Sequence, residues 1–329
     1  MPTSGEPAVT VVDISDLTVD RAGLDLLDQD AMPLQSTVLR ARRVIVRLDA
    51  ATVVYHAANQ RIRTRTSTHD GVLAYVTFGP RATGLVEGLQ VRPGMMVVAE
   101  PNAEVGFVVD PGWESVTVLV APEHIRTHMS ARRRDGEFRW PRGVELLRTD
   151  PALARALFRW GKRLATAASK APTRFDAGHA ERDAAQVELL ETLLAAMRST
   201  DTLETERTQR TRQAHTRIVT IAEDYVLARA GERVQVSDLC RAADVSERTL
   251  ECAFKEVVGL TPVAYLIRLR LHRVRAALLA AEHGSTRVSI EALKWGFWHF
   301  GEFARAYKAC FGERPSDTLR RPSPTAPGG

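Results

Sequence analysis

Residues 292–315 read "ALKWGFWHFGEFARAYKACFGERP", and the spacing of aromatic residues in this stretch decides the fold of the last third of the chain. Four aromatic residues stand within six positions, although aromatic residues make up only 6% of the 329 residues. They suggest either a platform on which single-stranded bases stack or the core of a small helical unit that reads a duplex. Phe303, Tyr307 and Phe311 follow at intervals of four residues, which is the period of one helix face. The spacing therefore favours a helical core over a stacking platform.

The same pattern occurs a second time, 53 residues upstream. The shift aligns Leu250 with Phe303, Ala253 with Ala306, Phe254 with Tyr307, Lys255 with Lys308, Gly259 with Gly312 and Pro262 with Pro315. Each copy predicts a short helix, a tight turn and a second helix that ends at a glycine. A continuous helix over residues 262–283 connects the copies, and at ~1.5 Å per residue it is long enough to hold them about one DNA turn apart. The last third therefore predicts two helix-turn-helix units that read one duplex.

Candidate DNA contacts lie on the helix faces opposite the two apolar stripes. In the first unit they are Ser246, Arg248, Thr249, Glu251, Cys252 and Lys255; in the second they are His299, Phe300, Gly301, Ala304, Arg305 and Lys308. Ser246 is also a good helix N-cap. Arg248 and Arg305 can donate to guanine O6 and N7, contact phosphate, or remain plain surface charges. Glu251 can accept from a cytosine amino group or pair with Lys255 within its own helix.

The two units are expected to read DNA unequally. Phe300 and Ala304 can touch thymine methyl groups, and Gly301 allows close approach of the backbone, so the second half-site should favour A·T pairs and be read partly through shape. The alternative is that Phe300 folds back beside Trp298 and that Arg305 holds only a phosphate. The arginines of "RLRLHRVR" (268–275) are expected to be solvated or to contact phosphate.

These residues resemble the DNA-binding domain of the AraC/XylS family of transcriptional regulators. The family pattern, a "GF" turn followed by F-x-x-x-[FY]-K-x-x-F-G-x-x-P-S, stands here as Gly296-Phe297, Phe303, Tyr307, Lys308, Phe311, Gly312, Pro315 and Ser316. The amino-acid sequence of residues 295–319 is most similar to the subgroup that contains the ethanolamine-operon activator. The sequence departs from the family pattern at Phe300, Gly301 and Thr318. The resemblance implies a transcriptional regulator, an activator or a repressor, with double-stranded promoter DNA and RNA polymerase as expected partners. Its expected assembly is a homodimer, and its upstream part would be a cupin-like effector or dimerisation domain.

The N-terminal part alternates short β-rich runs with turns. Runs such as "VLAYVTF" and "SVTVLV" between residues 35 and 121 predict a barrel or sandwich, and helical spacing begins near residue 122. The expected fold class is α+β, with an N-terminal cupin-like β-barrel and flanking helices, and a C-terminal all-α domain of two helix-turn-helix units joined by a linker helix. The expected domains are a cupin-like regulatory domain at 1–140, a helical dimerisation segment and linker at 141–210, the AraC-type domain at 211–321 and a disordered tail at 322–329.

Candidate residues for an effector site are Tyr55, Tyr75, Phe78, Phe107 and Trp113. The alternative is that these rings simply fill the core of the N-terminal domain.

The distribution of charge along the chain indicates where a nucleic acid would bind. Residues 211–321 hold 18 Lys and Arg against 13 Asp and Glu, which accounts for the whole net charge of +5. This distribution suits a nucleic-acid contact confined to one domain. No apolar run is long enough to span a membrane and the N-terminus lacks a basic, then apolar signal, so a cytoplasmic protein is expected.

No chemistry of catalysis is evident in the sequence. His124 and His128 are spaced to meet one metal ion, but without a third ligand an exposed helix face is the preferred reading. His56 and His69 stand alone, without the His-x-His and glutamate cluster of a cupin enzyme, and G-x-S-x-G and phosphate-loop motifs are missing. We therefore expect a DNA-binding regulator that is not an enzyme and has no metal or cofactor. A small-molecule effector bound by the N-terminal domain is expected, and the alternative is a constitutive regulator whose N-terminal domain serves only dimerisation.

Overall fold

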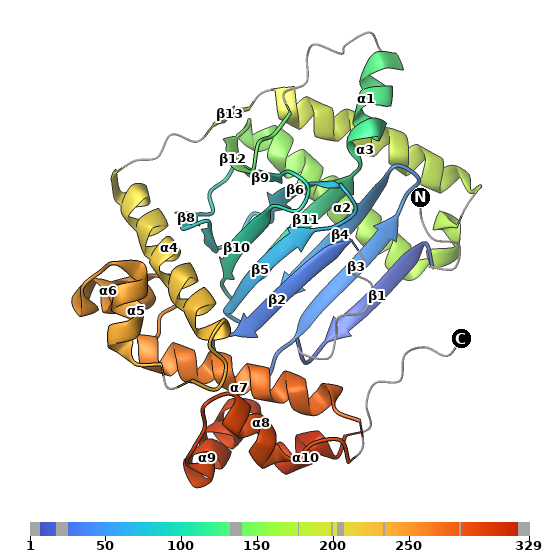
Figure 1. Cartoon of the computed structure of the whole chain (residues 1–329). Helices are drawn as coiled ribbons and strands as arrows, with labels where there is room; N and C mark the ends of the chain where they lie inside the picture. Colours follow the sequence, from blue (N-terminus) through green and yellow to red (C-terminus); the bar gives the residue numbers. More distant parts are fainter. Residues whose placement is uncertain are drawn as a thin grey trace.

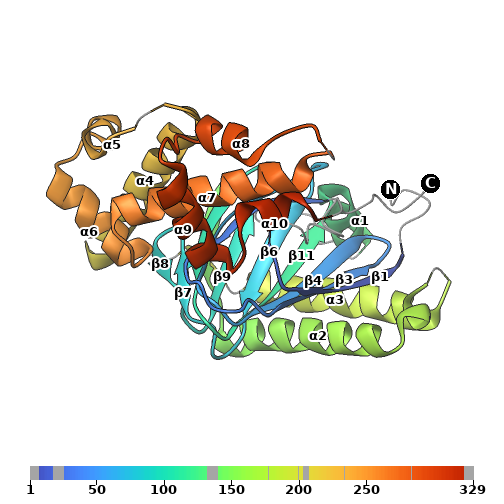
Figure 2. The same ribbon diagram turned by 90° about the horizontal axis from the view of Figure 1, so that it is seen from below.

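The computed structural model describes residues 7–17, 26–131, 140–176, 178–198, 200–202, 207–232, 234–282 and 284–321. Its elements form successive layers, which Figures 1 and 2 show from two directions. Helices from the middle of the chain cover one side of a pair of β-sheets, and the C-terminal helices lie on the other side (Figure 2). Among the described helices, none combines the length and the apolar character that crossing a membrane requires. The predicted tail at 322–329 lies outside the described residues.

The larger sheet is antiparallel and has eight strands. In spatial order these are β1 (Val9–Ile14), β3 (Ala41–Arg47), β4 (Ala51–Ala58), β11 (Trp113–Val120), β6 (Leu73–Phe78), β9 (Met95–Ala99), β12 (Val144–Arg148) and β13 (Asp201–Thr202). Every residue of β6 and β9 is buried, because both faces of the sheet are covered. One face packs on α1 (Pro122–Ala131), α2 (Pro151–Lys170) and α3 (Ala180–Arg198) through residues such as Tyr75, Val116 and Leu157. The other face packs against the second sheet through Val76, Val97 and Leu119.

The second sheet has five antiparallel strands. In spatial order they are β2 (Leu27–Pro33), β5 (Ile62–Thr68), β10 (Glu104–Val109), β7 (Gly84–Val86) and β8 (Leu89–Gln90). The two sheets face each other but share no strand pair among the described residues, so the predicted barrel is not closed. A sandwich suffices here because helices, rather than barrel closure, cover the outer faces. The apolar runs in the sequence did not predict β2 and β5, because these strands (LDQDAMP and IRTRTST) contain consecutive polar residues instead of apolar runs.

The C-terminal region is entirely helical. Its helices are α4 (Arg207–Leu227), α5 (Val236–Ala243), α6 (Glu247–Val257), α7 (Pro262–Ala280), α8 (Val288–Lys294), α9 (Phe300–Phe311) and α10 (Pro315–Leu319). The predicted pairs of short helices and the continuous connecting helix are confirmed. The expected domain limits at 140 and 210 stay predictions, although β12 extends the large sheet past residue 140 and α4 begins at Arg207, inside the expected linker.

Candidate nucleic-acid interface

The first helix-turn-helix unit is built on α5 and α6. Asp244 lies in the left-handed region, with φ of 52°, and turns the chain between the two helices. Ser246 caps α6, because its Oγ accepts a hydrogen bond from the backbone N–H of Thr249 at 3.2 Å. The apolar stripe Leu250, Ala253, Phe254 and Val257 is fully buried.

The opposite face of α6 is open to solvent. Arg248, Glu251, Cys252 and Lys255 are all exposed, as the period of the sequence predicted. Glu251 and Lys255 are not within ion-pair distance of each other in the structure, and the ion pairs of α6 use Glu256 instead. The side chains predicted to face the groove are therefore available for a partner.

The second unit is built on α8 and α9 in the same way. Gly296, with φ of 77°, makes the turn between the helices, and Gly312, with φ of 74°, ends α9. Phe303 and Tyr307 are buried, and the ring of Phe297 lies 4.9 Å from that of Phe303. The hydroxyl of Tyr307 donates to Thr318 Oγ1 at 2.9 Å, so the predicted aromatic core is confirmed.

All six predicted contact residues of the second unit are exposed, from His299 to Lys308. Phe300 is 45% exposed and Trp298 is 59% exposed, so Phe300 does not fold back into the core beside Trp298. A surface groove of about 660 Å³ runs along this face. It is lined by Phe300, Ala304, Arg305 and Lys308 of the predicted set and also by Arg287, Ser289, Arg314 and Ser316.

Arg287 and Arg314 were missed by reasoning from the sequence, because they precede α8 and α10 and lie off the face of α9. They place two further cations at the edge of an apolar floor made by Phe300, Phe303 and Pro315. Cations around an apolar floor suit a DNA strand, whose phosphates need positive charge and whose sugars and thymine methyl groups need apolar contact.

Three of the four arginines of the connecting helix α7 do not behave as predicted. Instead of being solvated or free for phosphate, Arg268, Arg273 and Arg275 bind the N-terminal part of the chain. Arg268 donates to the carbonyl of Pro33 at 3.2 Å and to Ser36 Oγ at 3.1 Å. Arg273 pairs with Asp30, and Arg275 pairs with Asp16 and Glu313. Their N-terminal partners lie more than 230 residues away in the sequence, which is why local reasoning could not assign them.

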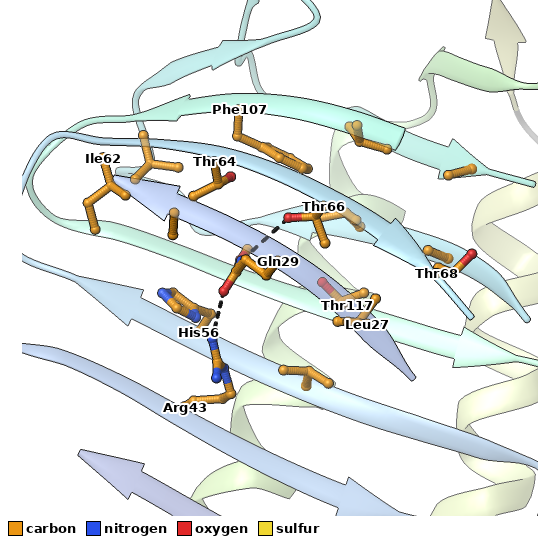
Figure 3. Close-up of a pocket in the computed structure, with 18 of the residues that line it drawn as sticks. Leu27, Gln29, Arg43, His56, Ile62, Thr64, Thr66, Thr68, Phe107 and Thr117 are labelled. Carbon is orange, nitrogen blue, oxygen red and sulfur yellow. Dashed lines mark hydrogen bonds between the residues drawn. The ribbon is translucent and has the colours of Figure 1, made fainter. Parts of the chain in front are cut away.

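A second candidate site is a cavity of about 100 Å³ between the two sheets (Figure 3). Of the five rings predicted to bind an effector, Phe107 and Trp113 line it, and Phe78 packs edge-on against Trp113 at 5.2 Å. Tyr55 and Tyr75 belong to the opposite face of the large sheet, so they do not line this cavity. The cause is strand register: side chains alternate between faces, and both tyrosines have the parity that faces α2.

The cavity wall carries a band of polar groups that the sequence did not reveal. Arg43, only 2% exposed, donates to Gln29 Oε1 at 2.7 Å, and Gln29 Nε2 lies 3.4 Å from Thr66 Oγ1 (Figure 3). Burial, followed by the charge of Arg43, lowers the pKa of His56 to about 3, so its ring is neutral at pH 7. A neutral imidazole offers one hydrogen-bond donor and one acceptor. The cavity thus combines an apolar lining with a few fixed polar groups, as small-molecule sites do.

Comparison with known proteins agrees with the geometry of the two units. Residues 239–321 match a family model described as a helix-turn-helix domain. Over 103 residues the chain is 40% identical to the probable thc operon regulatory protein of Rhodococcus erythropolis. Over 105 residues it is 36% identical to XylDLEGF operon transcriptional activator 3 of Pseudomonas putida. The chain carries a DNA-binding domain of the AraC/XylS family.

The sequence matches to these two relatives span about a third of each chain. The aligned segments cover 31% of this chain and 31% of the first relative, and 32% and 30% for the second. Among solved structures, a probable AraC family transcriptional regulator from Rhodopseudomonas palustris is 34% identical, with 32% of this chain and 99% of that chain covered and a TM-score of 0.29. The AraC-like transcriptional activator CuxR is 13% identical, with 82% and 91% covered and a TM-score of 0.36. The expected likeness to the ethanolamine subgroup stays a prediction.

The two histidines outside the AraC-type domain that were considered as metal ligands lie on α1. They are not on a fully exposed face as expected: the side chain of His128 is 10% exposed, and its Nε2 lies 3.6 Å from Glu191 Oε1. Across the described residues, His, Cys, Asp and Glu side chains do not gather in groups of three or more that could hold a metal ion.

Proposed function

We propose that this protein regulates transcription of an operon by binding promoter DNA with both units of its AraC-type domain. The observation that carries the proposal is the shared construction of α6 and α9. Each buries one apolar face in its own unit and leaves the opposite face, which carries basic residues, exposed, and α7 connects the two units. Two relatives are named as an operon regulatory protein and an operon transcriptional activator, which supports a role in transcriptional regulation.

The first experiment measures binding of the full chain to duplexes selected from a randomised library. Arg248→Ala should relax sequence preference at one or two positions of the first half-site and weaken binding there by ~1–3 kcal/mol, because a bidentate contact to guanine is lost. Arg159→Ala removes an exposed arginine of α2, far from both units, and serves as the control. Affinity should fall steeply with salt, since binding releases condensed counterions. Equal effects of the two substitutions would refute the assignment of α6 as a reading helix.

The second half-site is tested in the same selection. Phe300→Ala should weaken the preference for thymine, because the exposed ring lines the apolar floor of the groove. Arg287→Ala and Arg314→Ala should lower affinity without changing the selected sequence, because these two cations are placed to meet phosphates. A selection profile that Phe300→Ala leaves unaltered would show that the second unit does not read bases through this ring.

We further propose that a small molecule binds in the cavity between the sheets and controls DNA binding. The buried polar band formed by Arg43, Gln29 and His56 inside an apolar lining supports this function over a purely structural N-terminal domain. A panel of small metabolites can be screened by thermal unfolding of the full chain, because a ligand of the native state raises the midpoint. Arg43→Gln should abolish the shift that any positive compound produces in the wild type. Shifts that survive this substitution would place the compound elsewhere.

Activation through RNA polymerase and assembly as a homodimer complete the proposal. The relative named as a transcriptional activator supports the first. Transcription in vitro from the selected operator, placed upstream of a promoter, should rise when the full chain is added. Sedimentation at several concentrations tests the dimer, and a mass that stays that of one chain would refute it.

A further inference from the structure

Strand β5 has two faces that differ in chemistry. Side chains alternate between the faces of a sheet, so every second residue points to the same side. The cavity-facing residues of β5 are Ile62, Thr64, Thr66 and Thr68. The residues between them include Arg63 and Arg65, and they face the helices of the AraC-type domain.

The outward face of β5 holds helix α4 through a buried ion pair. The guanidinium of Arg63 donates to both carboxylate oxygens of Glu223, at 3.2 and 3.1 Å, and to Thr220 Oγ1 at 3.2 Å. The side chains of Arg63 and Glu223 are each only 4% exposed. The hydroxyl of Tyr265, at the start of α7, donates to the same carboxylate. One arginine of β5 is thus tied to both long helices that support the first helix-turn-helix unit.

The neighbouring strands repeat this division between two faces. On β2, Gln29 lines the cavity while Asp30 pairs with Arg273 of α7. On β10, Phe107 lines the cavity while Val108 packs into the apolar cluster of the first unit, beside residues of α4, α6 and α7. A single layer of sheet therefore separates the cavity from the DNA-binding helices.

On the opposite wall of the cavity, strand β11 packs against α2 rather than against the DNA-binding helices. Thr117 of β11 also lines the cavity, but its neighbour Val116 faces α2. The packing there is close: a Cβ added to Gly161 of α2 would lie 2.4 Å from Val116 Cγ1. Movement of β11 would therefore reach α2, whereas movement of β5 would reach α4 and α7.

We propose that β5 couples occupancy of the cavity to the position of the first helix-turn-helix unit on the sheet. Arg63 is the positioning residue, and it acts through Glu223. A strand transmits displacement because its two faces share one backbone and because the packed interior does not absorb volume freely. A buried, bidentate ion pair is sensitive to small shifts, since both charges have lost their water and depend on good geometry. The inference rests on the proposed effector role of the cavity, and it names the route by which an effector would act.

Hydrogen exchange of the full chain, without DNA or ligand, tests the coupling. Thr64→Ile adds bulk to the cavity from β5, and Thr117→Ile makes the same change from β11. Thr64→Ile should accelerate amide exchange in α4 by about fivefold, as expected for residues coupled through contact, and Thr117→Ile should change it by less than about twofold. Thr66→Ile is a second variant on β5 that gives a result even where Thr64→Ile does not fold.

The decisive comparison repeats Thr64→Ile in the background of Arg63→Met. If Arg63 transmits the change, Thr64→Ile should add less than about twofold to the exchange of α4 in this background. If Arg63 only stabilises the fold, the effects of the two substitutions should multiply. Multiplying effects, equal effects of Thr64→Ile and Thr117→Ile, or no effect of either β5 variant would each overturn the proposal. Because no ligand or DNA is present, these outcomes are separate from failure of DNA selection or of the metabolite screen.

Discussion

Removing one partner of the Arg63–Glu223 ion pair should cost much more stability than removing both. Burial lowers the pKa of Arg63, but the attraction of Glu223 outweighs it and the net pKa is raised, so the guanidinium stays charged. Glu223→Leu leaves this cation in a site where only 4% of its side chain meets solvent. Breaking such a pair from one side costs ~3–5 kcal/mol. The double variant Arg63→Leu/Glu223→Leu removes both charges and should lie far closer to the wild type.

The expected change in melting temperature follows from chain length. The apolar cluster that Met32 and Val108 share with α4 and α6 joins the two parts of the chain, so they should unfold as one unit. At ~2.1 cal/mol/K per residue, the unfolding entropy of 329 residues is ~0.7 kcal/mol/K, and the single substitution should lower Tm by ~4–7 °C. Differential scanning calorimetry of the wild type, both single variants and the double variant measures this. A double variant as unstable as the sum of the two single variants would refute the reasoning.

Three further predictions concern packing, titration and the groove face. Gly161→Ala should destabilise the chain by ~1–3 kcal/mol in denaturant titrations, because the new methyl group would overlap Val116; an unchanged midpoint would contradict the close packing of α2. Burial lowers the pKa of His56 and of His272 from 6.5 to about 3, so between these pH values the unfolded chain binds more protons than the folded chain. Stability should therefore fall as pH drops below 6.5, by up to ~1.4 kcal/mol per pH unit for each histidine. His56→Gln should flatten this slope in urea titrations at several pH values, and an equal slope would show that the ring is not held neutral. Cys252 is exposed on α6, and bound operator DNA should slow its alkylation at least about tenfold; a rate that DNA leaves unaltered would place α6 outside the groove.

The two helix-turn-helix units could be predicted because the residues that define each unit lie close together in the sequence. The periods of Leu250, Phe254, Phe303 and Tyr307 assign the buried faces of α6 and α9, and Gly312 marks the end of α9. The core of each unit comes mainly from about fifty consecutive residues, with Met32, Leu34 and Val108 added to the first, so spacing alone is enough to place exposed and buried residues. The N-terminal strands could be predicted only in part. Apolar runs predicted β6 and β11, whereas the mostly polar sequence "IRTRTST" did not predict β5.

The sequence by itself therefore determined the AraC-type domain, the two exposed faces of α6 and α9 and the mixed fold class. Only the tertiary structure decided what the charged residues outside those faces do. Arg63 meets Glu223 across 160 residues, and Arg273 meets Asp30 across 243. An arginine has the same sequence character whether it is solvated, bound to phosphate or buried against a carboxylate. Which of these it becomes depends on which surfaces dock, and docking is set by the combined burial of whole sheets and helices rather than by any local period.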